Sequence, residues 1–354
     1  MKSLLVLGLV AVFCLPVAAQ YDEDDEATRD YEEQDRRYME RLKNVPKPEV
    51  ESAPIQDPSA AFLELAEELV RDRNYSSAQT SRYFVQTDDP RLNAQATAEL
   101  LEVFRDYFDA FWRDRYPLGP YDKTSRVFLM YSFYKYNQLL AGDFRFSALR
   151  PQGHYGSLYD AISLHSDADG GPGATPDALI HEATHQLIDQ RIFAGEPPPV
   201  YWLTEGLASY FGYTYLDAKT GFREGTVGGK SVSIFSGAGG KAGQEARLIL
   251  RESAKAFKDY GKTHEAPLVV RLLAIDSPAR FYGENQRLNY TTSWLLVHTL
   301  FHADEGRYSD GFLRYLAREA VGDGGPEALY QELSLDAPGL QAALERHAKT
   351  LKAR

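Results

Sequence analysis

The sequence predicts an α/β fold with a mixed N-terminal lobe over residues 59–192 and a mostly helical C-terminal lobe over residues 193–354. In the first lobe, short β-rich runs alternate with segments whose apolar residues recur at helical spacing. In the second lobe, almost every periodic segment has helical spacing. The 354 residues are 44% hydrophobic and 25% charged, so the chain can bury a sizeable core.

The N-terminal lobe is expected to contain two early helices, over residues 60–71 and 93–113, because large apolar side chains repeat every three or four positions in both segments. Runs of β-branched and aromatic residues, bounded by polar turns, predict three strands at residues 82–86, 126–131 and 161–165. The order strand, helix, strand, helix, strand gives a mixed α/β lobe.

Turn and cap residues divide the middle of the chain. Gly153 and Gly156 predict a bend before the third strand. Thr175, followed by a proline and an aspartate, is typical of a helix start, and we expect a helix from there to about residue 192. Two glycine-rich patches, at residues 225–231 and 237–241, lack the full phosphate-loop pattern and are interpreted as loops.

The C-terminal lobe is expected to be built from amphipathic helices. Helical spacing of apolar residues continues to the end of the chain, without an internal repeat. The expected helices cover residues 202–215, 241–258, 290–301, 311–320 and 338–351.

The N-terminus predicts export. Residues 1–19 combine a lysine, a short apolar run and small residues before Gln20, which is typical of a signal peptide cleaved after Ala19 and too short for a membrane-spanning helix. Residues 20–58 are expected to be a disordered acidic linker, because residues 21–58 hold 13 acidic and 6 basic residues and few large aliphatic ones. We therefore expect a secreted or periplasmic protein without a stable membrane span.

The charge and the cysteine content exclude several functions. A formal charge of −12 disfavours nucleic acid as a partner, since its phosphates would be repelled. The single cysteine, Cys14, lies in the predicted signal peptide. A metal in the mature chain would therefore be bound by histidines and carboxylates.

The segment His181–His185, with the sequence HEATH, predicts a metal site on the helix that starts near Thr175. At about 100° per residue, His181 and His185 lie one turn apart on the same face and can share one ion. Zn²⁺ bound by two histidines and a carboxylate keeps a position for water, whose pKa falls toward ~7. Glu182 is suited to take the proton of that water, as a general base.

Glu205 is the expected third ligand. It is separated from His185 by 19 residues and stands in the sequence WLTEG at the start of the next predicted helix, which can lie antiparallel to the first. The alternative is a surface histidine pair with an unrelated acid. A second pair at helical spacing, His298 and His302, has no recognisable third ligand and is interpreted as the polar edge of a packed helix.

HEATH followed by WLTEGLASYF resembles the gluzincin (clan MA) metallopeptidases, the group of thermolysin and aminopeptidase N. The pattern is most similar to peptidase-MA-like bacterial families of unknown function, and the similarity extends from about residue 82 to the C-terminus. The resemblance implies a zincin-like fold that binds one Zn²⁺ per chain. By position, His181, His185 and Glu205 match the zinc ligands and Glu182 matches the general base.

Tyr290 resembles the tyrosine that opens a helix in aminopeptidase N relatives and donates its hydroxyl to the oxyanion of the transition state. The alternative is a packing tyrosine, one of 23 in the chain. Thermolysin-like enzymes use a histidine for this purpose, for which His264 is the candidate. Where those enzymes carry a second acidic residue, four positions after the third ligand, this chain has Ser209.

The resemblance also implies that a peptide pairs with an edge strand beside the metal. Residues 161–165 are the candidate for that strand, and His165 on it is expected to lie at the surface. The expected function is thus a secreted zinc metallopeptidase acting on a peptide or protein substrate. A non-catalytic binding protein on a zincin scaffold is the alternative, and hydrolysis of another bond is a third possibility.

Overall fold

The computed structural model describes residues 58–140, 153–166, 176–195, 200–230, 249–251, 253, 260, 266–283 and 285–352. The predicted signal peptide, nearly all of the acidic linker, the helix start at Thr175, the patch at residues 237–241, most of the helix expected over 241–258, and His264 lie outside these residues. Within the described part, no helix is both long and apolar enough to cross a membrane.

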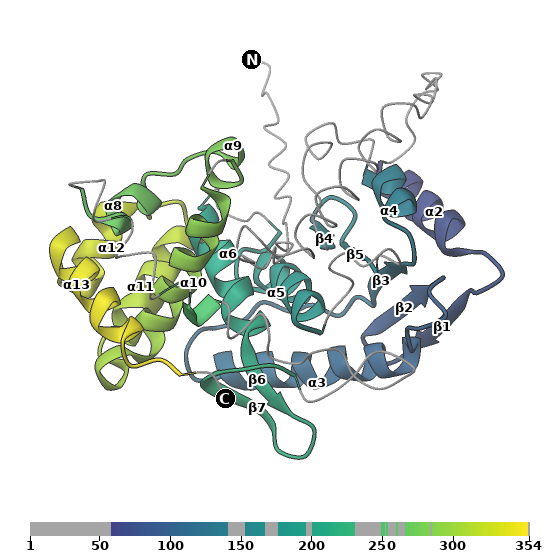
Figure 1. Cartoon of the computed structure of the whole chain (residues 1–354), viewed down its shortest axis with the longest axis horizontal. Coiled ribbons are helices and arrows are strands. Elements are labelled where there is room, and N and C mark those ends of the chain that lie inside the picture. The colour runs from purple at the N-terminus through teal and green to yellow at the C-terminus, as the bar shows by residue number, and fades with distance from the viewer. Residues whose placement is uncertain are drawn as a thin grey trace, which may run out of the picture.

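A five-stranded mixed sheet forms the centre of the N-terminal half (Figure 1). In spatial order its strands are β1 (Ser76–Gln79), β2 (Tyr83–Thr87), β3 (Ser125–Met130), β5 (Ala161–His165) and β4 (Gly153–Gly156). The strands β2, β3 and β5 are parallel, and the two outer strands run antiparallel to their neighbours. The three predicted strands are confirmed, each within one residue, and the fold is α/β as expected.

Two expectations about the third predicted strand are wrong. Residues 161–165 do not form an edge, because β4 pairs with β5 on its outer side. His165 is not a surface histidine either, since it is buried and its ring lies about 5 Å from the rings of Phe133 and Tyr136. Among the described strands, β4 is the outermost on this side.

The bend predicted at Gly153 and Gly156 is wrong, because both glycines lie in β4. A Cβ atom added to Gly153 would lie 2.8 Å from Cγ of Glu182, and one added to Gly156 would lie 2.1 Å from a ring carbon of Tyr159. Glycine in this strand therefore allows two side chains to approach the backbone closely, a known use of glycine in strands.

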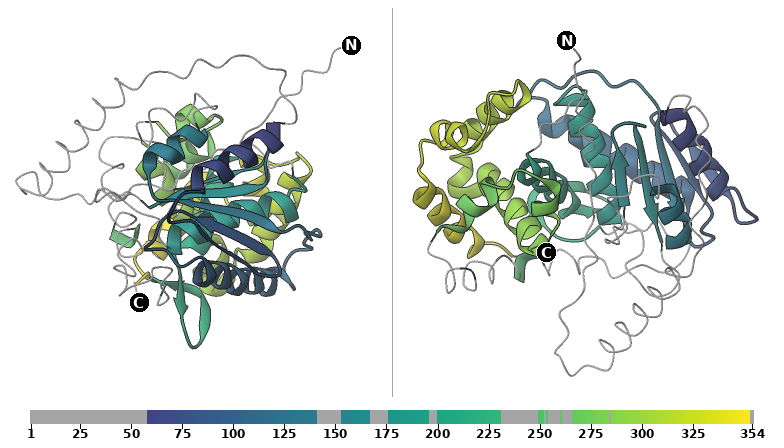
Figure 2. Two further views of the ribbon diagram at one scale, coloured as in Figure 1. Left: turned by 90° about the vertical axis from the view of Figure 1, so that its right-hand side faces the viewer. Right: turned by 90° about the horizontal axis from the view of Figure 1, so that it is seen from above.

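Helices cover both faces of the sheet. On one face lie α3 (Ala94–Trp112) and α5 (Pro176–Arg191), and on the other lie α2 (Pro58–Val70) and α4 (Phe133–Leu140). Seen from above in Figure 2, α2 in purple and α5 in teal lie on opposite sides of the strands. Three of these helices are confirmed within two residues of the predicted ends, whereas α4 was not predicted.

The C-terminal half is mostly helical, with one hairpin. Its elements are α6 (Tyr201–Gly212), β6 (Thr214–Asp217), β7 (Gly221–Val227), α8 (Leu268–Leu273), α9 (Pro278–Phe281), α10 (Gln286–His302), the 3-10 turn η2 (Ala303–Gly306), α11 (Ser309–Ala320), α12 (Pro326–Leu333) and α13 (Ala337–Ala348). The loop expected over residues 225–231 is wrong at its start, because residues 225–227 belong to β7. Neither the hairpin nor the short helices α8, α9 and α12 were predicted.

One continuous hydrophobic core joins the sheet face that α3 and α5 cover to the C-terminal helices. The helices α5 and α6 therefore lie between the sheet and the other C-terminal helices (Figure 1). The contact between α6 and α10 is especially close at Gly206, where an added Cβ would lie 2.7 Å from the carbonyl oxygen of Ser293. A second, smaller core lies between the sheet and α2 and α4. The packing fixes the two helices that carry the predicted metal ligands.

Candidate metal centre

Three side chains from α5 and α6 meet at one point. Nε2 of His181 lies 3.1 Å from Nε2 of His185, and Oε2 of Glu205 lies 3.3 and 3.6 Å from these two nitrogens. All three residues are buried, and one ligand atom from each lies within 4.8 Å of the others. The structure thus brings together the three residues that the sequence predicted as metal ligands.

The donor set fits a divalent metal ion. In the described part of the chain, Oε2 of Glu205 is buried without a hydrogen-bond partner although it faces two ring nitrogens. A buried carboxylate oxygen in that state is destabilising unless a cation compensates it. Two imidazole nitrogens and one carboxylate oxygen suit Zn²⁺ and related first-row ions. This group could therefore hold such an ion.

The protonation states at neutral pH are those that bind a metal. Burial lowers the pKa of His185 to about 4, so its ring is neutral. Burial by itself would raise the pKa of Glu205, but the positive charge that the His185 ring carries below its own pKa lowers the pKa of Glu205 to about 2, so its carboxylate is ionised. Metal binding needs neutral imidazole and ionised carboxylate, so little energy is spent on removing protons.

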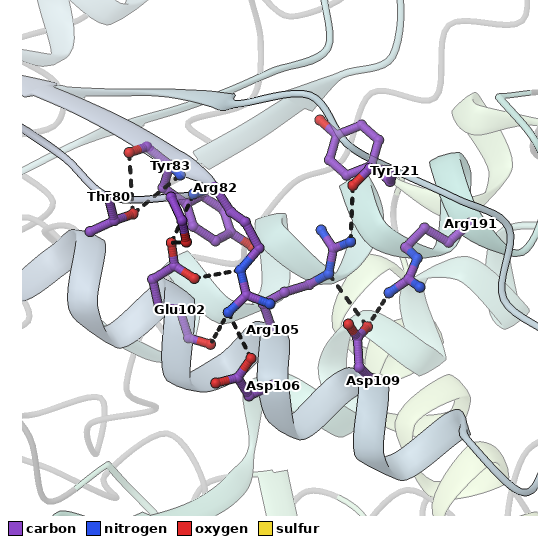
Figure 3. A network of polar contacts seen from close by, with 10 residues as sticks. Thr80, Arg82, Tyr83, Glu102, Arg105, Asp106, Asp109, Tyr121 and Arg191 are labelled. Atoms are coloured by element: carbon purple, nitrogen blue, oxygen red, sulfur yellow. Dashed lines mark hydrogen bonds and ion pairs between the residues drawn. The ribbon is translucent and has the colours of Figure 1, made fainter.

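The helix α5 is fixed at both ends by ion pairs. Near the start of α5, Oδ1 of Asp177 lies 3.1 Å from Nζ of Lys230, a buried lysine that follows β7 in the chain. In its last turn, Arg191 pairs with Asp109 of α3, and Asp109 also lies 3.4 Å from Nε of Arg105. Figure 3 shows Asp109 between the two guanidinium groups. These contacts hold the helix that carries both histidines.

Glu182 and the edge strand β4 are in close contact. The backbone of Gly153 lies against the Glu182 side chain, where an added Cβ would be 3.1 Å from Oε1. Two residues along β4, the hydroxyl of Tyr155 donates to Asp189 of α5 at 2.9 Å and accepts from Gln190 at 3.1 Å. Burial raises the pKa of Asp189 to about 6. These hydrogen bonds hold β4 against α5, the helix that carries the candidate general base Glu182.

Two tyrosines lie beside the ligand group. The ring of Tyr290, in the first turns of α10, lies 6.3 Å from the ring of His181 between centroids. Tyr282, which directly follows α9, donates its hydroxyl to Oε1 of Glu205 at 2.6 Å. Burial, reinforced by the charge of Glu205, raises the pKa of Tyr282 well above its usual value. Tyr282 was not predicted, because no spacing or motif distinguishes it from the other tyrosines.

The second histidine pair lies in a separate cluster. Nδ1 of His298 shares a hydrogen bond with Nε2 of His347 at 2.9 Å, and the hydroxyl of Tyr210 lies 2.7 Å from Nε2 of His302. The partners come from α13 and α6, so the cluster joins three helices. This agrees with the interpretation of the pair as part of helix packing.

No protein-family model matches the chain, and no curated protein matches it either.

Proposed function

We propose that this protein is a zinc metallopeptidase of the gluzincin group with a zincin-like fold. The observation that carries the proposal is the convergence of His181, His185 and Glu205, with Glu182 on the same helix beside a strand edge. The motifs HEATH and WLTEGLASYF support the same class. The predicted signal peptide adds the proposal that the enzyme acts outside the cytoplasm, as a secreted or periplasmic protein.

In the proposed reaction the three metal ligands, Glu182 and Tyr290 have separate roles. The three ligands would hold Zn²⁺, which when bound polarises a carbonyl and makes water more acidic. Glu182 accepts a proton from the attacking water and returns it to the leaving amine. Tyr290 donates its hydroxyl to the negative charge that develops on the carbonyl oxygen. Burial of the site strengthens these electrostatic contributions.

The substrate is proposed to pair with β4 instead of β5. A peptide that adds to a sheet pairs with an outer strand. Among the described strands, β5 has neighbours on both sides, whereas β4 is the outermost. Because Glu182 lies against Gly153 of β4, a peptide on this edge would be held next to the general base. Because Gly153 has no side chain, the Glu182 side chain can lie directly against the backbone of β4.

The first test is metal content by elemental analysis of the mature protein, with His185→Ala and Glu205→Ala beside the wild type. One zinc per chain in the wild type and none in either variant is expected. Hydrolysis of a peptide library should then depend on zinc and be lost in Glu182→Gln. A wild type that binds zinc but cleaves no peptide would overturn the peptidase proposal in favour of a binding protein on this scaffold, or of hydrolysis of another bond.

A further inference from the structure

We propose that Tyr282 is a positioning residue for the metal, which fixes Glu205 so that a single oxygen faces the ion. The inference rests on the metal centre of the proposed function but not on peptide hydrolysis. It follows from a contact between two buried residues that are 77 positions apart in the sequence.

The two oxygens of the Glu205 carboxylate have different surroundings. Oε1 accepts the hydrogen bond of Tyr282 at 2.6 Å, while Oε2 faces the ring nitrogens of His181 and His185 at 3.3 and 3.6 Å. A carboxylate can bind a metal through one oxygen or through both. The phenol occupies Oε1 and thereby favours binding through Oε2 alone, which leaves room for water at the ion.

The position of Tyr282 is itself fixed by a chain of contacts. The side chain of Asn289, in α10, donates to the carbonyl oxygen of Phe281 at 2.6 Å and accepts from Arg271 of α8 at 2.8 Å. Phe281 and Asn289 are fully buried. The backbone N–H of Tyr282 also donates to Pro278 at 2.8 Å. The short helix α9 is therefore held at the carbonyl group next to Tyr282.

Aromatic packing restricts the ring as well. The ring centroid of Tyr282 lies 5.1 Å from that of Phe281, 6.0 Å from that of Tyr201 and 6.3 Å from that of Tyr290. A ring enclosed in this way has few rotamers, so its hydroxyl is already in place before a metal binds. Groups that orient a metal ligand in this manner typically contribute 10–100-fold to metal affinity.

The test is the Tyr282→Phe variant, which removes one oxygen atom and keeps the ring. We expect its dissociation constant for Zn²⁺, measured by competition with a chromophoric chelator, to rise by about 10–100-fold. The visible spectrum of the Co²⁺-loaded protein should also change, because a released Oε1 lets Glu205 bind through both oxygens and raises the coordination number. Neither measurement depends on catalysis.

The matched control is Tyr315→Phe. Tyr315 is also a buried tyrosine that donates to a carboxylate, that of Glu319 on its own helix α11. Its ring stacks on Trp202 of α6, but its hydroxyl bonds Glu319 and not a ligand residue. This variant loses the same kind of hydrogen bond and is expected to keep wild-type zinc affinity and the wild-type cobalt spectrum. Equal affinities and spectra for the wild type and Tyr282→Phe would overturn the proposal.

Asn289→Ala provides a second, independent variant. Because Asn289 acts through Tyr282, the zinc affinity of Asn289→Ala should fall by less than the zinc affinity of Tyr282→Phe. The double variant should bind zinc no more weakly than Tyr282→Phe alone. Fully additive losses would contradict the chain of contacts. If the wild type binds neither zinc nor cobalt, the metal centre and the role of Tyr282 both fail. If all variants behave as expected but no peptide is cleaved, only the peptidase proposal fails.

Discussion

Two histidine pairs at helical spacing occur in this protein, and their rings are arranged almost identically. The ring centroids of His181 and His185 on α5 are 4.9 Å apart, and those of His298 and His302 on α10 are 4.8 Å apart. The third partner differs: the first pair faces the carboxylate of Glu205, while the second faces neutral hydrogen-bonding groups on other helices.

The difference shows that ring spacing alone does not define a metal site. In the described residues, only the first pair belongs to a group with three ligand atoms within 4.8 Å. A buried carboxylate introduces a negative charge that needs a cation, whereas the hydrogen bonds described for the second cluster join neutral rings to one another and to a phenol. The first arrangement is suited to binding an ion and the second to joining helices.

The largest expected effect is loss of the metal when a ligand is removed. In Glu205→Ala the zinc affinity should be more than about 100-fold below that of the wild type, a larger loss than in the variants of Tyr282 or Asn289. Hydrolysis should be lost completely. His302→Gln is the matched variant of the other cluster and should retain one zinc per chain. Elemental analysis after dialysis measures both. Zinc loss in His302→Gln would show that the two clusters are not separate.

Glu182→Gln should lower turnover by about 10²–10⁴-fold, because an amide cannot accept the proton of water. Zinc content should remain that of the wild type, since Glu182 is not one of the three converging ligands. Steady-state hydrolysis and metal analysis on the same preparation test the prediction. A glutamine variant with full activity would be incompatible with the assigned role.

Acid should weaken the second cluster. Burial, assisted by the charges of His347 and Arg115, lowers the pKa of His302 from 6.5 to about 4. Because the folded pKa lies below the unfolded one, the neutral ring contributes stability above pH 6.5, which is lost as the pH falls toward 4. Between about pH 7 and about pH 5 the loss should be about 2 kcal/mol.

Urea unfolding of metal-free protein at both pH values measures this loss. The control is again His302→Gln, whose amide oxygen can still accept from Tyr210 but does not titrate. Its free energy of unfolding should fall less on acidification than that of the wild type. An identical fall in both proteins would remove His302 as the cause.

The smallest effect is expected from Tyr210→Phe. Tyr210 lies on α6, the helix of Glu205, but its hydroxyl contacts His302 of the second cluster. Loss of that hydrogen bond should lower the free energy of unfolding by about 0.5–1.5 kcal/mol. Zinc affinity should not change. A weaker zinc affinity would mean that α6 transmits strain from one cluster to the other.

Local signals in the sequence predicted much of the architecture. The helix over Pro176–Arg191 was predicted from the cap residues at its start, and the strand over Ala161–His165 from its run of strand-forming residues. The short elements α8, α9 and β6 were not, since four to six residues provide too little periodicity. The position of β4 was also missed, because its two glycines look like a turn although they accommodate the side chains of Glu182 and Tyr159.

The part of the candidate site whose residues lie close together in the sequence was predicted. His181, His185 and Glu205 lie on consecutive helices, and their spacing identifies them. Tyr282 and the third histidine of the second cluster, His347, join their sites through tertiary packing alone. Contacts of this kind have no periodicity in the sequence, so only the folded chain reveals them.

The separation of Tyr282 from the ligands along the chain has a consequence for the order of assembly. The three ligands lie within residues 181–205, and closing so short a segment costs less chain entropy than docking α9. We expect a folding chain to capture its ion once α5 and α6 meet and to hold it weakly until α9 arrives. Pulses of chelator during refolding would detect such a weakly bound stage. Metal uptake would then accompany folding of this protein and guide it, with the final helices closing over an ion already in place.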